Sequence, residues 1–361
     1  MYPAKMSGYV SFFASRIFFF LVLAGTLAAC SVAEMEKFAL EGNELTKTSK
    51  PKRDTGLSQK VGAKLLSAES IIHGGRRSYK GFSGQFGRLL IGEADEIRLQ
   101  NPVAVGGVDG MLYIVDAGPK IVYKYDLITN EIEPLGEVAT HFRGDPGNIY
   151  VARDRSFYIV DTVGRQVLHF SEYGELRTTF QDLANLSRPI DVIVNEKTGD
   201  VLVADGSFSH IVVFNSMGKA TNAIGQRGTG PGRFRAITFM TSGADGLYVL
   251  DRLELPVQVI DWQGNYHYSF GGSELLYPSA IAVDKDQRAF IADRSSNTIL
   301  VYQDGQLSLT FGASGSAPGR FRLITGLWVN DNLLYVADSL NQRVQVLRIN
   351  PSAALPVIPG G

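Results

Sequence analysis

An apolar segment that ends in an aspartate occurs six times in this chain, at a nearly constant spacing. The six residues are Asp116, Asp161, Asp205, Asp251, Asp293 and Asp338, and successive members lie 42 to 46 residues apart. A period in the low forties that consists of strands and turns is typical of propeller blades. The repeat therefore predicts an all-β chain folded as a six-bladed β-propeller, in which the loops at the two faces of the ring carry any function.

Positions at fixed distances from these aspartates are apolar. Three residues before each aspartate stand Tyr113, Tyr158, Leu202, Tyr248, Phe290 and Tyr335. Six residues after each aspartate stand Val122, Val167, Ile211, Val257, Ile299 and Val344. Sheets packed on both faces by neighbouring blades need such β-branched and aromatic side chains. Asp-Gly pairs, among them Asp245-Gly246 and Asp304-Gly305, supply hairpin turns between the strands.

The sixth blade is one strand short. Its strands are expected at 326–329, 333–337 and 344–349, and the chain then enters a Pro-rich tail at 351–361. An apolar run upstream of the first blade, Arg88-Leu89-Leu90-Ile91-Gly92, is expected to supply the fourth strand and to close the ring. The alternative is a last blade of three strands with a free edge.

The N-terminus has the features of an export signal. A short apolar run from Ile17 to Ala29 ends in Leu27-Ala28-Ala29-Cys30, which resembles the lipobox of bacterial lipoproteins. Cys30 is the one cysteine of the chain. The resemblance implies that residues 1–29 are a signal peptide and that acyl chains on Cys30 anchor the exported protein. The alternative is an ordinary secretory signal with an incidental cysteine.

The segment that follows the signal predicts a tether. Residues 30–85 are expected to form this tether, because the segment is largely polar and mixed in charge and 46–60 hold almost no large apolar side chain. The propeller is expected to follow at 86–350. Ser31, which follows Cys30 in place of an aspartate, implies sorting to the outer membrane, facing the periplasm. The formal net charge is −1 and the chain has no long basic run, so nucleic acid is not an expected partner. A monomeric propeller is expected.

The blades resemble the NHL repeat. The fullest copy runs from Leu334 to Val346 and carries the family's aspartate, asparagine and arginine at Asp338, Asn341 and Arg343. The Gly- and Pro-rich connectors Gly225–Phe234 and Gly312–Phe321 match the family's link into the next blade. The resemblance covers about 101–349 and implies the propeller fold, but it does not name a function. Blade four has Leu253-Glu254-Leu255-Pro256 where the Asn/Arg pair is expected, so its loop should differ.

Two features could suggest a cofactor or a metal. The glycines from Gly225 to Gly232 lie between two predicted strands, whereas a phosphate-binding loop leads into a helix, so we interpret them as a connector. The six aspartates could form a metal ring or could each cap the turn after their strand. A residue that recurs in every blade serves the blade, which favours capping. No cofactor is predicted.

Enzymatic activity is the alternative function. Some NHL-type propellers are peptide-amidating lyases that bind zinc through histidines around the channel. The histidines of this chain are His73, His141, His169, His210 and His267, and none starts an inner strand. The residues nearest the channel are Pro102, Asn148, Asp191, Ala236, Ala280 and Gly326. Asn148 and Asp191 are thus the polar channel-lining candidates, and one carboxylate does not make a general acid–base pair. No catalytic or metal-binding residue is assigned, and a lactonase- or lyase-type enzyme remains the alternative.

Arginines collect on one predicted face of the ring. The loops between blades and the loops after the repeated aspartates share this face, and their candidate ligand-binding residues are Arg227, Arg233, Arg235, Arg252, Arg294, Arg320 and Arg322. The opposite face collects acids, including Asp200, Asp245, Asp286 and Asp304. Because arginine captures carboxylates and phosphates, a protein or an anionic envelope polymer is the expected partner. The alternative is that several arginines, Arg343 first, are structural.

Overall fold

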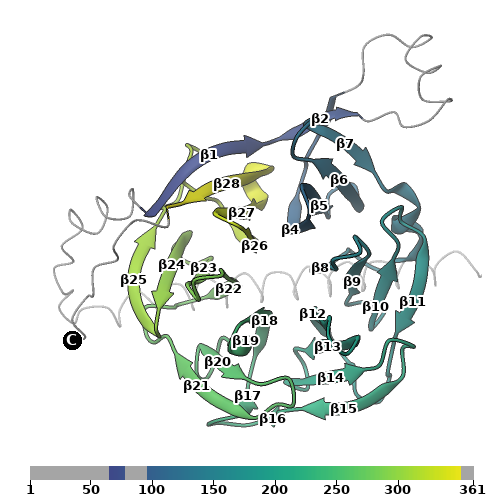
Figure 1. The fold of residues 1–361 in the computed structure, drawn as a ribbon, viewed down its shortest axis with the longest axis vertical. Helices are drawn as coiled ribbons and strands as arrows, with labels where there is room; N and C mark the ends of the chain where they lie inside the picture. The colour runs from purple at the N-terminus through teal and green to yellow at the C-terminus, as the bar shows by residue number, and fades with distance from the viewer. Residues whose placement is uncertain (1–64, 78–95, 351–361) are drawn as a thin grey trace, which may run out of the picture. The chain divides into compact units, whose positions relative to one another are not determined.

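The computed structural model describes residues 65–77 and 96–350. Six antiparallel sheets surround a central axis, and the first strand of each blade lies innermost (Figure 1). The strands of the first three blades are β4 Pro102–Val108, β5 Met111–Asp116, β6 Ile121–Asp126, β7 Glu131–Pro134; β8 Ile149–Val151, β9 Phe157–Asp161, β10 Gln166–Phe170, β11 Leu176–Phe180; β12 Pro189–Asn195, β13 Asp200–Asp205, β14 His210–Phe214 and β15 Ala220–Ile224. The six-bladed propeller predicted from the repeat is confirmed.

The last three blades repeat the same order. Their strands are β18 Ile237–Gly243, β19 Gly246–Asp251, β20 Val257–Ile260, β21 Tyr266–Phe270; β22 Pro278–Val283, β23 Ala289–Asp293, β24 Thr298–Gln303, β25 Gln306–Phe311; β26 Ile324–Asn330, β27 Leu333–Asp338 and β28 Arg343–Ile349. Two 3-10 helices, η1 Gly136–His141 and η2 Ser339–Asn341, lie in loops. Each repeated aspartate is the last residue of the second strand of its blade.

The apolar positions of the repeat form the core between blades. The six residues that precede the aspartates by three positions are all buried, as are the six that follow by six positions. The clusters they form join adjacent blades: Phe290, Val301 and Leu334 of blades five and six belong to one cluster. Hydrophobic burial between sheets therefore fixes the loops at both faces.

An N-terminal strand closes the ring, but it is not the predicted one. Strand β1 (Leu66–Ile72) pairs antiparallel with β28, from Leu66 opposite Ile349 to Ile72 opposite Val344. Arg348 Nε and Nη2 donate to the Glu69 carboxylate at 2.9 and 2.6 Å across this pair. The prediction that 88–92 supplies the fourth strand is wrong, because β1 occupies that edge of β28. Residues 88–92 lie outside the described residues.

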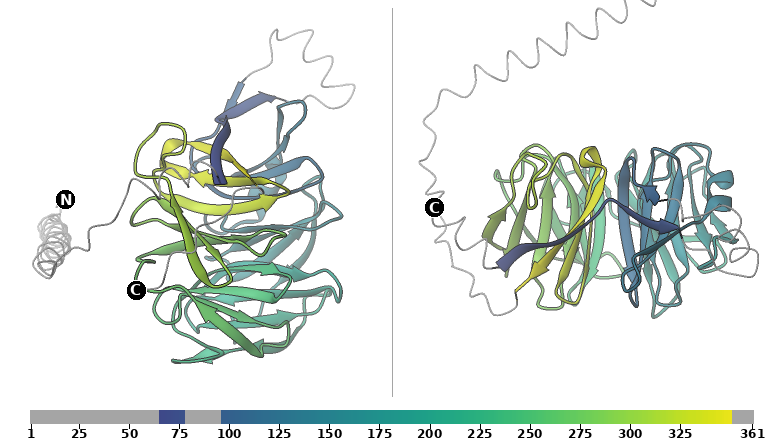
Figure 2. Two further views of the ribbon diagram at one scale, coloured as in Figure 1. Left: turned by 60° about the vertical axis from the view of Figure 1, so that its left-hand side comes forward. Right: turned by 90° about the horizontal axis from the view of Figure 1, so that it is seen from above.

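The same N-terminal segment also extends blade one. Strand β2 (Gly74–Arg77) pairs parallel with β7, and β3 (Glu96–Arg98) pairs with β2. Figure 2 shows this segment passing from blade six to blade one across the outside of the ring. The boundary predicted between tether and propeller, at 85/86, therefore falls too late. Strand β1 escaped the prediction because only its ends, Leu66 and Ile72, are buried, while 67–70 are exposed.

Cys30, the tether before residue 65 and the tail at 351–361 lie outside the described residues. No helix within the described ranges has the length and apolar character needed to cross a bilayer.

Candidate functional site: the arginine-bearing loop face

The repeated aspartates organise one face of the ring. Each is fully buried at the end of its strand. Asp251, for example, accepts hydrogen bonds from the backbone N–H groups of Arg235 at 2.6 Å, Ala236 at 3.0 Å and Leu253 at 2.9 Å. One carboxylate thus joins the loop after its own strand to the connector from the preceding blade. The predicted capping role is confirmed for the first five aspartates, which also bind connector amides. Asp338 binds the connector amide of Arg322, but after its own strand it binds the side chains of Asn341, Arg343 and Gln345. No cluster of three or more metal-ligating side chains occurs in the described ranges.

The two Gly-rich connectors are held from beneath by buried glutamines. Gln258 in β20 accepts from the Gly232 N–H at 2.9 Å and donates to the Arg233 carbonyl at 2.6 Å. Gln345 in β28 makes the same pair of bonds, to Gly319 at 3.0 Å and to the Arg320 carbonyl at 2.7 Å. Both glutamines have no exposed surface. The arginines of these connectors therefore project from fixed backbone, which lowers the entropic cost of binding.

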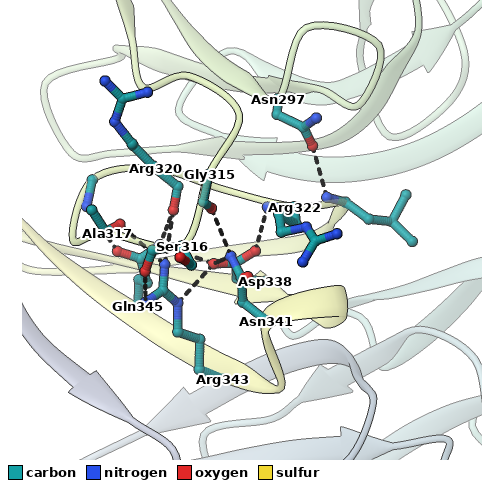
Figure 3. A network of polar contacts seen from close by, with 12 residues as sticks. Asn297, Gly315, Ser316, Ala317, Arg320, Arg322, Asp338, Asn341, Arg343 and Gln345 are labelled. Carbon is teal, nitrogen blue, oxygen red and sulfur yellow. Dashed lines mark hydrogen bonds and ion pairs between the residues drawn. The ribbon is translucent and has the colours of Figure 1, made fainter.

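Arg343 is structural, as the alternative interpretation holds. Its Nε donates to Asp338 at 2.8 Å, and its Nη1 and Nη2 donate to the carbonyls of Ser316 and Arg320 at 2.7 and 2.9 Å (Figure 3). Blade four has Pro256 at the corresponding position. There Glu254 supports the connector instead, accepting from the Gly230 N–H at 3.2 Å. The contacts of that loop therefore differ, as the sequence predicts.

All seven candidate arginines are exposed on the loop face. Arg235 lies 3.8 Å from the Glu254 carboxylate, and Arg320 donates to the Ser314 carbonyl at 3.3 Å. Four of these seven, Arg227, Arg233, Arg294 and Arg322, have neither a carboxylate partner nor a side-chain hydrogen bond among the described residues.

Two of the arginines contact the ring of Tyr277. The guanidinium carbons of Arg252 and Arg294 lie 4.6 and 4.3 Å from the centre of the Tyr277 ring, within cation–π range. Arg252 also donates a hydrogen bond to the Tyr277 hydroxyl. Tyr277 occupies a connector position at which blades four and six have Arg235 and Arg322, and nothing in its sequence surroundings marks this role.

A pocket opens beside this group, between blades five and six. It has a volume of about 520 Å³ and is lined by Arg294, Asn297, Ser314, Gly315, Arg322, Leu323 and Leu340. Two arginines predicted separately are thus brought to one cavity, while Arg227, Arg233, Arg235 and Arg320 lie outside its lining. Sequence reasoning missed Asn297 because its blade shows only the general pattern of the repeat. It missed Leu323 because an apolar residue in a loop carries no signal.

Some cations of the opposite face are paired with acids. Arg288 is buried and donates to Asp284 at 2.6 Å and to Asp286 at 2.9 Å. The further pairs are Arg153–Glu196 at 3.0 Å, Arg177–Asp154 at 3.3 Å and Lys124–Glu172 at 3.1 Å. The described residues offer no ion pair to Arg155, Lys197, Lys219 and Lys285 of that face, so cations without an acidic partner occur on both faces.

The channel candidates form a buried contact rather than an exposed site. Asp191 is 2% exposed and accepts from the backbone N–H groups of Val192 at 2.9 Å and Met240 at 2.6 Å. The Asn148 side chain also hydrogen-bonds to it, whereas burial raises the pKa of Asp191 to about 7. Asp191 thus lies on the inner strand β12, as expected, with its carboxyl buried between β12 and β18, and its channel-lining role stays a prediction.

His169 and His210 have structural surroundings. The His169 ring stacks on Tyr158 at 4.0 Å, and burial lowers the pKa of His169 to about 4. His210 Nε2 lies 2.8 Å from the Asn185 carbonyl. Neither imidazole is presented to a channel-mouth reaction centre.

Comparisons with known proteins give the fold. No protein-family model matches this chain, and no curated protein matches it either. Among solved structures it is similar to a structural genomics protein of unknown function from Bacteroides thetaiotaomicron (TM-score 0.57, 15% identity, 79% of this chain and 76% of that one). It is also similar to a streptogramin B lyase (0.53, 13%, 70% and 95%) and to virginiamycin B lyase from Staphylococcus aureus (0.52, 12%, 69% and 95%). At these identities the likeness shows the β-propeller fold alone.

Proposed function

We propose that this protein is a non-enzymatic binding module of the bacterial cell envelope. In this proposal, acyl chains on Cys30 anchor it to a membrane, outer-membrane sorting follows from Ser31, and the arginine-bearing loop face binds an anionic partner. The observation that carries the proposal is the group of exposed arginines on this face. Arg227, Arg233 and Arg294 have neither a carboxylate partner nor a side-chain hydrogen bond among the described residues, and the buried Gln258 holds the connector that bears two of them.

Exposed apolar side chains on the same face favour a protein over a carbohydrate polymer. Leu253, Leu276 and Leu340 are 52%, 67% and 60% exposed and lie in the loops that carry Arg252, Arg294 and the pocket. Interface hot spots are enriched in arginine and tyrosine, and Tyr277 stands among the arginines here. A strictly polar polymer would leave the leucines uncovered. We therefore favour an acidic protein surface and treat an anionic envelope polymer as the other outcome of the test.

The lyase or lactonase alternative has less support. Two of the similar structures are lyases, but that likeness extends only to the fold. At the channel, Asp191 is buried and hydrogen-bonded, so it is not placed to exchange a proton with a substrate.

Charge reversal on each face tests the proposal. The full-length protein in detergent is used as bait for envelope extract, with the double variants Arg227→Glu/Arg233→Glu and Asp200→Lys/Asp245→Lys compared in parallel. The arginine variant should lose its partner, by roughly 1–3 kcal/mol for each charge-assisted contact, without a change in melting temperature. The aspartate variant should keep it. Protease treatment of the extract distinguishes a protein from a polymer, and loss of binding only in the aspartate variant would overturn the assignment of the face.

A further inference from the structure

The connector into blade six departs from the pattern of the other Gly-rich connector. In blade four the amides of both Arg235 and Ala236 bind Asp251. In blade six the Arg322 N–H binds Asp338 at 2.7 Å, but the next amide, Leu323, donates instead to Asn297 Oδ1 of blade five, also at 2.7 Å. Asn297 Nδ2 donates to Ser314 Oγ at 3.1 Å. A side chain from one blade thus shapes the floor of the pocket in the next.

This arrangement holds Leu323 in an unfavourable conformation. Its φ is +66°, in the left-handed region that bulky side chains avoid. Conformations of this kind persist only where the surroundings impose them, and they concentrate at ligand-binding sites. Here the Leu323 N–H donates to Asn297 Oδ1 and the Leu323 carbonyl accepts from the Ser339 N–H at 3.1 Å, and Leu323 lines the pocket.

The chemistry of the lining selects a class of ligand. Arg294 and Arg322 have no carboxylate partner among the described residues, and the lining contains no acidic residue. Two guanidinium groups favour an oxyanion, since each can donate two parallel hydrogen bonds to it. Leu323 and Leu340 supply an apolar wall beside that charge, and Leu340 is 60% exposed.

We infer that the pocket between blades five and six binds an oxyanion, a carboxylate or a phosphate, that is attached to an apolar group. The inference rests on the proposed function, because it places part of the anionic partner's recognition in one cavity of the loop face. It goes further in requiring that the same cavity bind a small molecule with this chemistry in the absence of any macromolecular partner.

A set of matched small probes tests the inference. Hexanoate, hexyl phosphate and the neutral hexanamide are titrated into the full-length protein in detergent, and binding is followed by ligand-observed NMR. At least one anion should bind, and hexanamide should bind at least tenfold more weakly. The ratio of the two anions assigns the carboxylate or the phosphate as the preferred group. Equal binding of hexanamide, or failure of both anions to bind at millimolar concentration, overturns the inference.

Three variants locate the probe. Asn297→Asp keeps the acceptor for the Leu323 N–H but puts a negative charge in the cavity, and Arg322→Ala removes one guanidinium. Each should lower the association constant for the bound anion about tenfold or more. Arg227→Ala removes an arginine that also has no ion pair and lies on the same face, but outside the lining of the pocket. This variant should change the association constant less than twofold. Equal loss in all three variants would show general attraction to the face and overturn the pocket. The envelope bait experiment alters Arg227 and Arg233 on this face and leaves the pocket residues unchanged, so each idea can fail without the other.

Discussion

Asp191 Oδ2 lies 2.6 Å from the backbone nitrogen of Met240 and joins the inner strand of blade three to the inner strand of blade four. The carboxyl is fully buried, and its two backbone partners do not offset the loss of hydration, so its pKa rises to about 7. This contact has a measurable effect on stability.

Unfolding free energy should fall as pH rises from about 4 to 7 through the contribution of Asp191. The native state holds the proton up to about pH 7, whereas the unfolded chain releases it near pH 4, so the contribution is full below pH 4 and declines by at most about 1.4 kcal/mol per pH unit. Asp191→Asn should remove this component, and Asp200→Asn, at a half-buried aspartate outside this contact, should keep it. Denaturant unfolding at several pH values measures the slopes. Identical slopes for wild type and Asp191→Asn would contradict the assignment.

Leu66→Ala should destabilise the propeller by about 2–5 kcal/mol, because this side chain of β1 is fully buried where β1 pairs with β28 and closes the ring. The freed edge of β28 should also promote aggregation. Thermal unfolding and light scattering report both effects, with Ser67→Ala at the exposed neighbouring position as the control. A melting temperature equal to that of the control would show that β1 is dispensable.

Asp338→Ala should cost about 3–5 kcal/mol. The substitution leaves the buried Arg343 without its carboxylate and removes the acceptor of the Arg322 N–H, so the connector of blade six should loosen as well. Asp331→Asn, at an exposed aspartate of the same blade whose φ of +50° asparagine also tolerates, is the control and should change stability by less than about 0.5 kcal/mol. Hydrogen exchange at 312–323 gives an independent readout. If exchange there stays slow, the aspartate does not organise the connector.

Cys30→Ser should move the protein out of the membrane fraction, since no acyl chain could then be attached. Fractionation and a mobility shift of the unprocessed form report the outcome. A variant that stays processed and membrane-bound would rule out the lipoprotein assignment. The propeller itself should keep its melting temperature, because Cys30 precedes the first described strand.

The fold could be predicted because the same positions of the repeat are apolar, and therefore expected to be buried, in all six copies. A single residue such as Phe290 says little, but six equivalent apolar positions at one spacing admit few architectures. The capping role of the aspartates followed from the same argument. Strand β1 could not be found this way, because it occurs once and buries only Leu66 and Ile72.

The site was predictable only in part. Arg294 and Arg322 could be placed on one face from topology, but their meeting in one cavity depends on where blades five and six converge. Asn297 and Leu323 shape the pocket through a hydrogen bond between two blades, and no local sequence pattern predicts that bond. Conversely, Asp191 has the residue type of a channel acid, and only its neighbours show that it is buried.

The pairing of β1 with β28 also determines which step of folding comes last. Strand β1 is the first described strand to be synthesised, and its partner β28 is the last. Closing so long a loop is entropically costly and slow, so the ring is completed only after the other blades have formed. A chain that stops before Ile349 would display unpaired strand edges, the kind of surface that chaperones and proteases recognise. Closure thereby reports that the whole propeller has been made.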